Sequence, residues 1–410
     1  MLFIWYILFP GLSRSGLIPY YQQIDDLIFL VMALFIIPKL FLNKGKIKIR
    51  RFYLEVTVLI LIVIFLSMLY QRSSWKLTIE FTYLVLRPLI LLFYIYIYDI
   101  QVGRVYNNIV LISRLLILIN LPAVLKNLAT YNISIISNQY ADSVVGFFPF
   151  NNNDALIWLY TIVLLKDFYE AFIARGNRKY YWLFAFEYLL LLSTINVKYI
   201  LLVTCLLGLI IFMKSRYKVR NIFLFSLVII YPLIIFLPYI QIRIKAIETA
   251  PVYQITKDII QNNINEYNPL LGTGPGTFTS ESAIESNTLL AKKYVHPVIE
   301  WRKENFGSKA GTLSRPTSSA LTLFGEIGIF GVLLYVGLIL YVTYRNYKNL
   351  NLSYIFLIGF VMGLYVLIVG MFMNVWFWGT ELFLLSLSAK YLSDMALNSN
   401  SKLLSPIAVE

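Results

Sequence analysis

Long apolar runs, most of them close to the roughly 20 residues that cross a bilayer, follow one another through most of this 410-residue chain. Lipid offers backbone groups no hydrogen-bond partner, so such runs fold as α helices. They can be drawn at 1–12, 24–42, 53–70, 77–98, 105–126, 150–170, 180–196, 197–213, 221–240, 320–343, 353–370 and 372–391. The sequence predicts an all-α integral membrane protein with about 12 transmembrane helices, or 11 if the short first run is not a span.

The composition agrees with this class and excludes a soluble domain. Charged residues make up only 14% of the chain, which is too few to solvate the surface of a soluble protein of this length. The net charge of +14 would favour a nucleic-acid partner in a soluble chain. Here the basic residues lie in short clusters between apolar runs, so we expect them to set the topology and expect no nucleic-acid partner.

Basic residues divide unevenly between alternate linkers. If the basic linkers lie in the cytoplasm, 19 lysines and arginines of the linkers and span ends are inside, and five lie in the short outer loops: Arg14, Arg72, Lys76, Lys126 and Lys198. This bias follows the positive-inside rule. It predicts a protein of the cytoplasmic (inner) membrane with its C-terminus in the cytoplasm.

The same orientation divides the chain into four parts. Residues 1–240 hold the first nine spans, 241–319 form one long polar external loop before the tenth helix, 320–392 hold the last three spans, and 393–410 form a cytoplasmic tail. The long loop is where chemistry on a water-facing substrate is expected. ATP, NAD and nucleotide sugars are cytoplasmic, so an external site argues against them, and we expect no cofactor.

The external loop carries the string Asn-Pro-Leu-Leu-Gly-Thr-Gly-Pro-Gly-Thr-Phe at 268–278. Its glycines lack the Lys-Ser/Thr of a Walker loop and the preceding strand of a dinucleotide turn. Pro269 and the glycines predict a compact turn whose backbone amides, at Gly274 and Gly276 among others, either bind an anion or sugar hydroxyls or only shape the chain.

Two arginines, Arg87 and Arg114, lie near the middle of apolar spans, where an arginine costs about 2.5–3.5 kcal/mol on insertion scales. One interpretation is a structural ion pair with Glu326 or Glu80. The other is a wet cavity in which the guanidinium groups attract phosphate oxygens.

Glu326 follows Gly325 in a helix that also holds Gly328 and Gly331. Three small residues spaced three apart predict a smooth stripe on which another helix packs closely. A carboxylate beside that stripe needs a cation, and the two buried arginines are candidates. At the start of this helix, Arg315 and Pro316 predict a helix N-terminus that faces outward and favours a diphosphate, or a plain helix start.

Three further polar residues belong to the outer loops and span ends. Lys198 lies in a tight hairpin between two spans, where it either anchors the helix end or contacts a phosphate. Asn151 opens another span, as a cap or as a hydrogen-bond partner of a sugar. His296 is the only histidine, so a histidine-rich metal site is excluded and we expect no metal.

The order of these features resembles the O-antigen ligase and O-antigen polymerase superfamily of bacterial membrane glycan enzymes. Four pieces carry the resemblance over roughly 145–345: Phe-Pro-Phe-Asn-Asn-Asn at 148–153, a serine-threonine hairpin at 193–198, the proline-glycine string at 268–278, and Glu-Ile-Gly-Ile-Phe-Gly at 326–331.

The resemblance implies a fold of about a dozen helices and a metal-independent reaction that joins lipid-linked oligosaccharide repeat units. A sugar hydroxyl of one unit attacks the anomeric carbon of another, and undecaprenyl diphosphate leaves. Fixed cations aimed at the departing diphosphate are the expected device. The implied diphosphate contacts are Arg87, Arg114, Lys198, Arg243 and Arg315, with Glu326 as orienting partner or base. The implied partners are the lipid-linked oligosaccharide, membrane lipid and a chain-length regulator.

The chain also departs from the family pattern. The hairpin carries Lys198 in place of an arginine, and the arginine expected before the proline falls on Gln254, so Arg243, Lys257 or Arg315 would supply that charge. The His-Asn pair typical of ligases falls on Thr317 and Ser318, which favours a polymerase. A ligase and a flippase of the lipid-linked unit remain the alternatives, although paired repeats typical of transporters are not found.

Overall fold

The computed structural model describes residues 49–130, 154–174, 178–194, 197–214, 268–297, 318–371 and 380–403, with single residues and short pieces at 30–42, 219–237 and 300. These residues are almost entirely helical and form no strand. The helices run as α3 (Arg51–Gln71), α4 (Trp75–Ile97), α5 (Val102–Thr130), α6 (Asp154–Phe168), the π-helix η1 (Tyr169–Ala174), α7 (Arg178–Ser193), α8 (Val197–Lys214), α11 (Glu281–Glu285), α12 (Leu289–Tyr294), α14 (Ser319–Lys348), α15 (Tyr354–Gly370) and α16 (Thr380–Leu403). The expected helical class is confirmed for this part of the chain.

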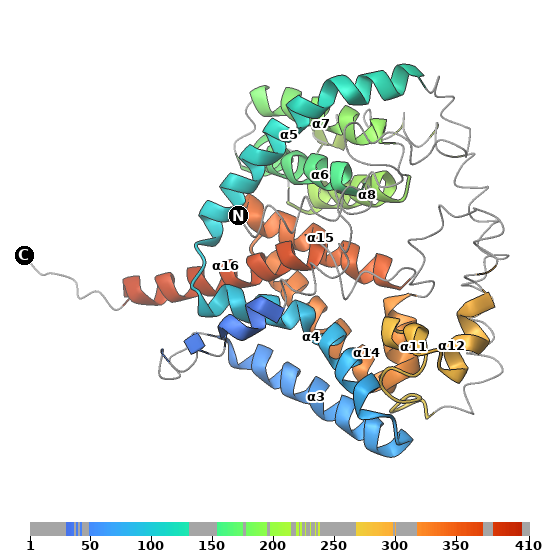
Figure 1. The fold of residues 1–410 in the computed structure, drawn as a ribbon. Helices are drawn as coiled ribbons and strands as arrows, with labels where there is room; N and C mark the ends of the chain where they lie inside the picture. The colour runs from blue at the N-terminus through green and yellow to red at the C-terminus, as the bar shows by residue number, and fades with distance from the viewer. Residues whose placement is uncertain are drawn as a thin grey trace, which may run out of the picture.

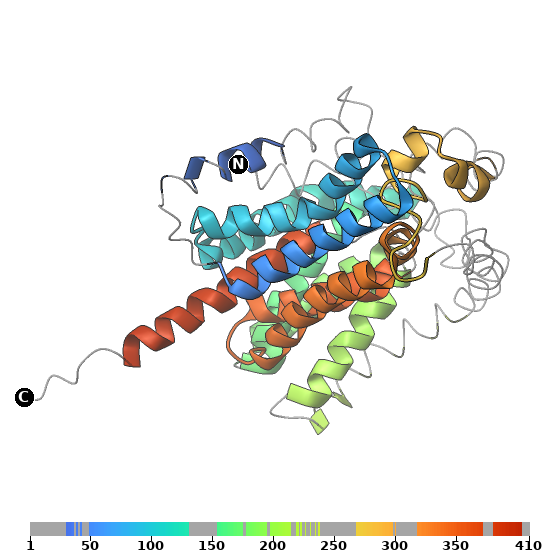
Figure 2. The same ribbon diagram turned by 90° about the horizontal axis from the view of Figure 1, so that it is seen from below.

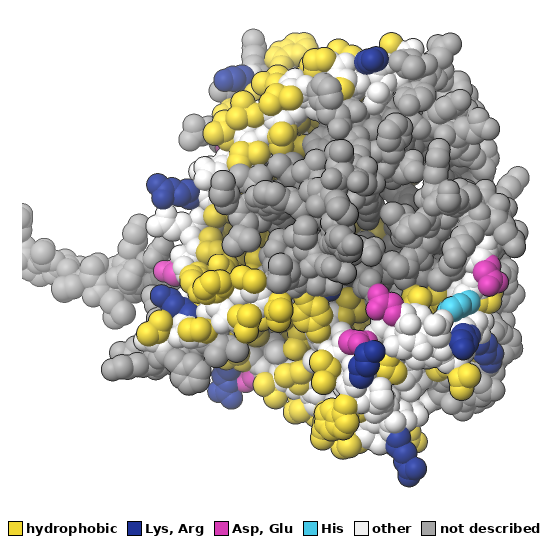
Figure 3. All heavy atoms as spheres, in the orientation of Figure 1, with side chains coloured by type: hydrophobic (Ala, Val, Ile, Leu, Met, Phe, Trp, Pro, Cys, Tyr) yellow, Lys and Arg dark blue, Asp and Glu magenta, His cyan; other side chains and the backbone are white. Residues whose placement is uncertain are grey.

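Four helices are long and apolar enough to cross a membrane: Arg51–Gln71, Trp75–Ile97, Val102–Asn127 and Ser319–Lys348. Helices at Ile200–Lys214 and Tyr354–Gly370 are apolar but shorter. Side chains such as Leu54, Val58 and Phe65 of α3 are exposed. An apolar outer face of this kind suits contact with lipid, and Figure 3 shows hydrophobic side chains over much of the described surface.

The described helices pack side by side as a bundle (Figures 1 and 2). α14 packs against α3 and α15, and α16 packs against α4 and α15. A second group continues the bundle, because α6 contacts α5, α7 and α15. One continuous apolar core joins both groups, with the aromatic rings of Phe81, Tyr106 and Phe168 fully enclosed.

The expected spans match the described helices within a few residues, with three informative differences. The span expected at 150–170 ends in a π-helix, the span expected at 372–391 is described as a helix that begins at Thr380 and continues to Leu403, and α14 is two helical pieces joined at Gly328. α14 begins at Ser319 with Ser318 as its N-cap, so Pro316 does not open this helix. The run at 1–12 lies outside the described residues, as does most of 221–240.

The last turn of α3 and the first turns of α4 and α14 lie at the same end of the bundle, beside residues 268–294. We call this the loop end. Figures 1 and 2 show the short helices α11 and α12 beyond that end of α14. The opposite end, where α3 begins and α4 ends, is the clamp end.

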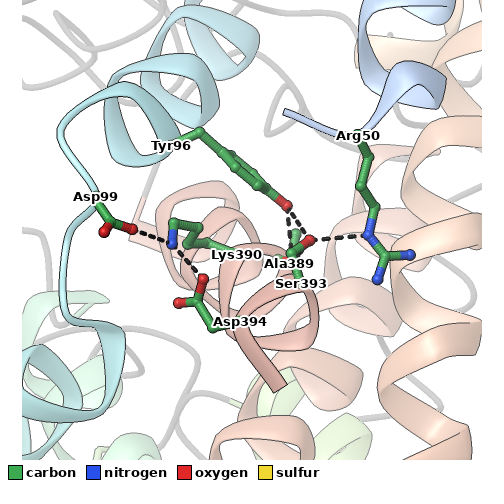
Figure 4. Close-up of polar contacts among 7 residues, drawn as sticks. All are labelled: Arg50, Tyr96, Asp99, Ala389, Lys390, Ser393 and Asp394. Carbon is green, nitrogen blue, oxygen red and sulfur yellow. Dashed lines mark hydrogen bonds and ion pairs between the residues drawn. The ribbon is translucent and has the colours of Figure 1, made fainter. Parts of the chain in front are cut away.

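Polar contacts from α16 close the clamp end (Figure 4). The buried ammonium group of Lys390 donates to Asp99, at 2.8 Å, and to Asp394. Asp99 follows the C-cap of α4, Tyr98, in a left-handed backbone conformation with φ of 45°. The lysine therefore ties the turn between α4 and α5 to α16.

A second set of contacts lies beside this lysine. The hydroxyl groups of Tyr96 and Ser393 share a hydrogen bond of 2.7 Å, and Arg50 Nε donates to Ser393 Oγ at 2.9 Å. Figure 4 shows Arg50 reaching this pair from the start of α3. The clamp end thus joins α3, α4 and α16 through side chains, whereas the contacts at the loop end also include bonds between backbone groups.

Candidate functional site

The candidate site lies at the loop end and is built on residues 268–280, which we call the proline-glycine segment. It opens with a tight turn in which Gly272 N–H donates to Asn268 O at 2.6 Å, and Asn268 Oδ1 accepts from Leu270 N–H at 2.9 Å. Gly272, Gly274 and Gly276 have φ values of 73°, 107° and 73°. Side chains disfavour this left-handed region, so the glycines permit the turn that the sequence predicts.

The segment replaces missing hydrogen bonds of α14. Gly328 has φ of 70° and ψ of −169°, so the helix breaks there, and the carbonyls of Gly325 and Glu326 lose their regular partners. Thr273 N–H donates to Gly325 O at 2.7 Å, and Gly274 N–H donates to Glu326 O at 3.1 Å. The backbone of the segment therefore completes the broken helix.

The bond on the other side of the break runs in the opposite direction. Ile329 N–H, which follows Gly328, donates to Pro269 O at 2.9 Å. A Cβ atom at Gly328 would overlap the Leu270 carbonyl, and a Cβ atom at Gly272 would lie 2.5–2.7 Å from backbone atoms of Gly325 and Glu326. Glycine is thus required on both sides of the contact.

The glycine stripe of α14 was expected to receive another helix. It instead receives the proline-glycine segment, because Gly325 faces the ring of Phe278 and Gly328 faces the Leu270 carbonyl. Gly331 lies against the side chain of Ile327 of its own helix. The expectation of close approach is confirmed, but the element that approaches is a loop.

The carboxylate of Glu326 is fully buried and enclosed by backbone amides of the segment. Its Oε2 accepts from Gly276 N–H at 2.5 Å, and its Oε1 accepts from Ser280, Thr279 and Phe278 N–H at 2.8, 3.1 and 3.3 Å. Successive amides that converge in this way form an anion-binding nest. The anion in this nest is a side chain of the same protein.

This arrangement changes the expected roles of three residues. Gly274 and Gly276 were expected to present their amides to a substrate, but these amides bind the carbonyl and the carboxylate of Glu326. Glu326 was expected to need an arginine, and among the described residues its donors belong to residues 276–280. Its acceptor sites are occupied, so the carboxylate holds the segment in place.

Two polar side chains of α3 also hydrogen-bond to backbone carbonyls of the segment. Ser67 Oγ donates to Leu271 O at 2.6 Å and lies 3.1 Å from Glu326 O. Gln71 Nε2 donates to Gly272 O at 2.7 Å. Neither residue was singled out from the sequence. Polar residues in the last turn of an otherwise apolar helix are the signal that could have found them.

The segment leads directly into α11 and α12. Ser280 caps α11, Thr288 caps α12, and Thr288 Oγ1 donates to Thr277 O at 2.7 Å. A small apolar cluster of Phe278, Tyr294 and Leu321 joins the segment and α12 to the first turn of α14. The position of the two short helices therefore depends on the proline-glycine segment.

The two arginines of the spans lie in different environments. Arg87 of α4 is 3% exposed, and its guanidinium lies over the ring of Tyr83 at 4.7 Å from the centroid. Arg114 of α5 donates from NH2 to both oxygens of Asp167, each at 2.7 Å. Asp167, a buried residue of α6, is the partner of Arg114, in place of the expected Glu326 or Glu80.

Several expected site residues cannot be placed. Arg243, Arg315 and Asn151 lie outside the described residues, as do Lys257 and Gln254. Lys198 is the second residue of α8, and the position of its side chain is not described. Within the described residues, no three of His, Cys, Asp or Glu gather closely enough to hold a metal ion.

Comparison with models of known protein families gives no match for this chain. Comparison with curated protein sequences likewise gives no match. The functional argument therefore depends on the residues themselves and on how the fold brings them together.

Proposed function

We propose that this protein is a polysaccharide polymerase of the O-antigen polymerase superfamily that joins undecaprenyl-diphosphate-linked oligosaccharide repeat units. The hydroxyl of one unit attacks the anomeric carbon of another, and the bond from that carbon to the diphosphate oxygen breaks. The two glycans are joined, the hydroxyl proton is released, and undecaprenyl diphosphate leaves. The reaction uses no nucleotide and no metal.

One observation carries the proposal: the two most specific pieces of the resemblance are in direct contact. The proline-glycine string at 268–278 and the glutamate-glycine helix at 326–331 are 48 residues apart in sequence, measured from Phe278 to Glu326. They bond through backbone and carboxylate around the break at Gly328. A motif pair that forms one structural unit supports a shared role better than two separate matches.

The proposed topology has about 12 spans in the cytoplasmic membrane, with the loop end outside and the clamp end in the cytoplasm. The basic residues Arg50, Arg51 and Arg345 belong to the clamp end, in agreement with the positive-inside rule. The external location suits a lipid-linked substrate that has already crossed the membrane.

Within this proposal, Glu326 is a positioning residue. It holds the proline-glycine segment, and through it α11 and α12, at the edge of the substrate site. The cations that stabilise the departing diphosphate are Arg315, Arg243 and Lys198, which belong to the external loops of the proposed topology. Arg114, bound to Asp167, is assigned to the fold instead.

Reconstitution tests the proposal. The purified protein is placed in liposomes with the undecaprenyl-diphosphate-linked repeat unit extracted from its host, with a metal chelator and without nucleotide. We expect a ladder of joined units, which Gly276→Ala abolishes and Gly337→Ala leaves unchanged. A unit that stays single with the native protein contradicts the proposal. Transfer of finished polymer to a second acceptor identifies a ligase, and movement of the unit without joining identifies a flippase.

A further inference from the structure

Three helices meet at a polar cluster that the proposed reaction does not use. Arg114 of α5 contacts Asp167 of α6, and Glu187 of α7 interacts with the same aspartate. Asp167 is fully buried and Glu187 is 5% exposed. The cluster therefore places two carboxyl groups inside the helix bundle, beside a guanidinium group whose side chain is 36% exposed.

The two carboxyl groups have different partners. Both oxygens of Asp167 accept from Arg114, at 2.7 Å each, which is the pattern of an ionised carboxylate. Glu187 hydrogen-bonds to Asp167, and no N–H or O–H group of the described residues donates to its buried Oε2. The one positive charge of Arg114 is paired with the carboxylate of Asp167.

Hydrogen-bond chemistry decides the state of Glu187. Two ionised carboxylates are both acceptors, so a hydrogen bond between them requires a proton on one of them. A buried carboxylate without donors also carries a large desolvation cost, which the neutral form avoids. Asp167 is already bound to the guanidinium, so Glu187 is the group that carries the proton.

The surrounding charged groups do not supply a cation that would neutralise an ionised Glu187. Lys166 of α6 interacts with Asp167 and Glu187, but its ammonium group also lies 5.6 Å from the ring centroid of Tyr354 and interacts with Glu170 of η1. Arg114 of α5 and Lys166 and Asp167 of α6 are the charged groups that interact with Glu187, and Glu170 of η1 joins this set through Lys166. With Glu187 neutral, these groups balance as two positive and two negative charges.

We propose that Asp167 and Glu187 form an acid pair that binds one proton inside the bundle, with Arg114 as its fixed counter-charge. The site goes beyond the proposed transfer reaction. Arg114 lies 12 residues into α5, and Glu187 lies nine residues into α7. At the rise of an α helix, Arg114 is therefore on the order of 18 Å from the start of α5, and Glu187 is on the order of 14 Å from the start of α7. Loss of the proton places a second negative charge between α6 and α7.

Infrared spectroscopy of the full protein in lipid nanodiscs tests the proposal, with the carbonyl stretch of a protonated carboxyl group as the readout. At neutral pH, we expect the wild-type spectrum to contain such a band that Glu187→Gln removes and that shifts in heavy water. Glu170→Gln is the matched control, because Glu170 lies three residues after Asp167 and is partly exposed. We expect it to leave the band unchanged. Glu187→Gln is expected to fold, because its amide N–H can donate to Asp167 in place of the proton.

A second variant separates a shared proton from simple burial. In Asp167→Asn, Arg114 is left with Glu187 as its only carboxylate partner in this cluster, so we expect Glu187 to ionise and its band to disappear. A band that persists in Asp167→Asn overturns the acid pair, because it shows that burial alone keeps Glu187 neutral. A Glu187→Gln spectrum identical to that of wild type also overturns it.

Discussion

The carboxylate of Glu326 accepts a hydrogen bond of 2.5 Å from the backbone N–H of Gly276, a residue 50 positions earlier in the chain. Three more amides of the same segment donate to this carboxylate. A buried carboxylate is stable when hydrogen bonds replace its water. The bond between these two residues therefore helps to fix the proline-glycine segment to a long apolar helix, and among the described residues the hydrogen-bond donors to this carboxylate are backbone amides of that segment.

Gly276→Ala is expected to release the proline-glycine segment. Gly276 has φ of 73°, and an added Cβ atom would lie 2.6 Å from the Leu77 carbonyl oxygen. The left-handed backbone alone costs about 1–2 kcal/mol for alanine. We expect a lower melting temperature of the purified protein and faster cleavage near α11 by an added protease.

Gly337→Ala is the matched control for that variant. Gly337 lies in α14, outside the contact with the segment, and nothing lies within 4 Å of its Cβ position. Alanine is favoured over glycine in a helix by about 0.5–1 kcal/mol, so the melting temperature should stay or rise. An equal fall in melting temperature in both variants would show that an added methyl group destabilises the protein even where space is open, and it would contradict the role given to Gly276.

Glu326→Gln is expected to loosen the segment although the side chain keeps its size. One acceptor oxygen becomes an NH2 donor and faces backbone N–H groups, and hydrogen bonds to a charged group contribute about 1.5–3 kcal/mol. Protease sensitivity of residues 281–297 should increase while total helix content by circular dichroism is retained. Glu55→Gln, at an exposed pair with Arg51, should change neither.

Arg114→Ala is expected to destabilise the protein by about 3–5 kcal/mol, because it leaves Asp167 buried without its cation. Adding Asp167→Asn removes the stranded charge and should restore much of the lost stability. Thermal unfolding of the two single variants and the double variant measures this coupling. Polymer formation that stays lost in a stable double variant would instead assign Arg114 to the substrate.

Lys390→Met is expected to cost no more than about 1 kcal/mol, although its ammonium group has two carboxylate partners. The Asp99 side chain is 83% exposed and that of Asp394 is 31% exposed, so water can replace the lysine at both. The melting temperature should fall far less than in Arg114→Ala. A comparable fall would show that the clamp end controls the stability of the bundle.

The sequence predicts the helices well because apolar length is a local property. The span expected at 53–70 is the helix Arg51–Gln71, and the span expected at 353–370 is Tyr354–Gly370. The count of about 12 spans stays a prediction, since four described helices meet the length and hydropathy of a span. The compact turn predicted for residues 268–278 is also confirmed, although its amides at Gly274 and Gly276 bind Glu326 of the same chain.

The partners of the polar residues could not be predicted in the same way, because they depend on contacts between distant helices. The break at Gly328 is stabilised by amides of Thr273 and Gly274, far away in sequence. Glu326 and Arg114 looked like partners because both are charged residues in apolar runs. Asp167 and Glu187 also lie in predicted spans, and attention to these acids would have indicated the pairing with Arg114.

Deletion of the gene in its host, with the carrier-linked and surface glycans sized by gel and mass spectrometry, tests the central claim most directly. The proposed polymerase predicts that single repeat units accumulate on the outer leaflet and that no long ladder forms, until the native gene is restored. Long polymer retained on undecaprenyl diphosphate, or units confined to the cytoplasmic leaflet, would contradict it.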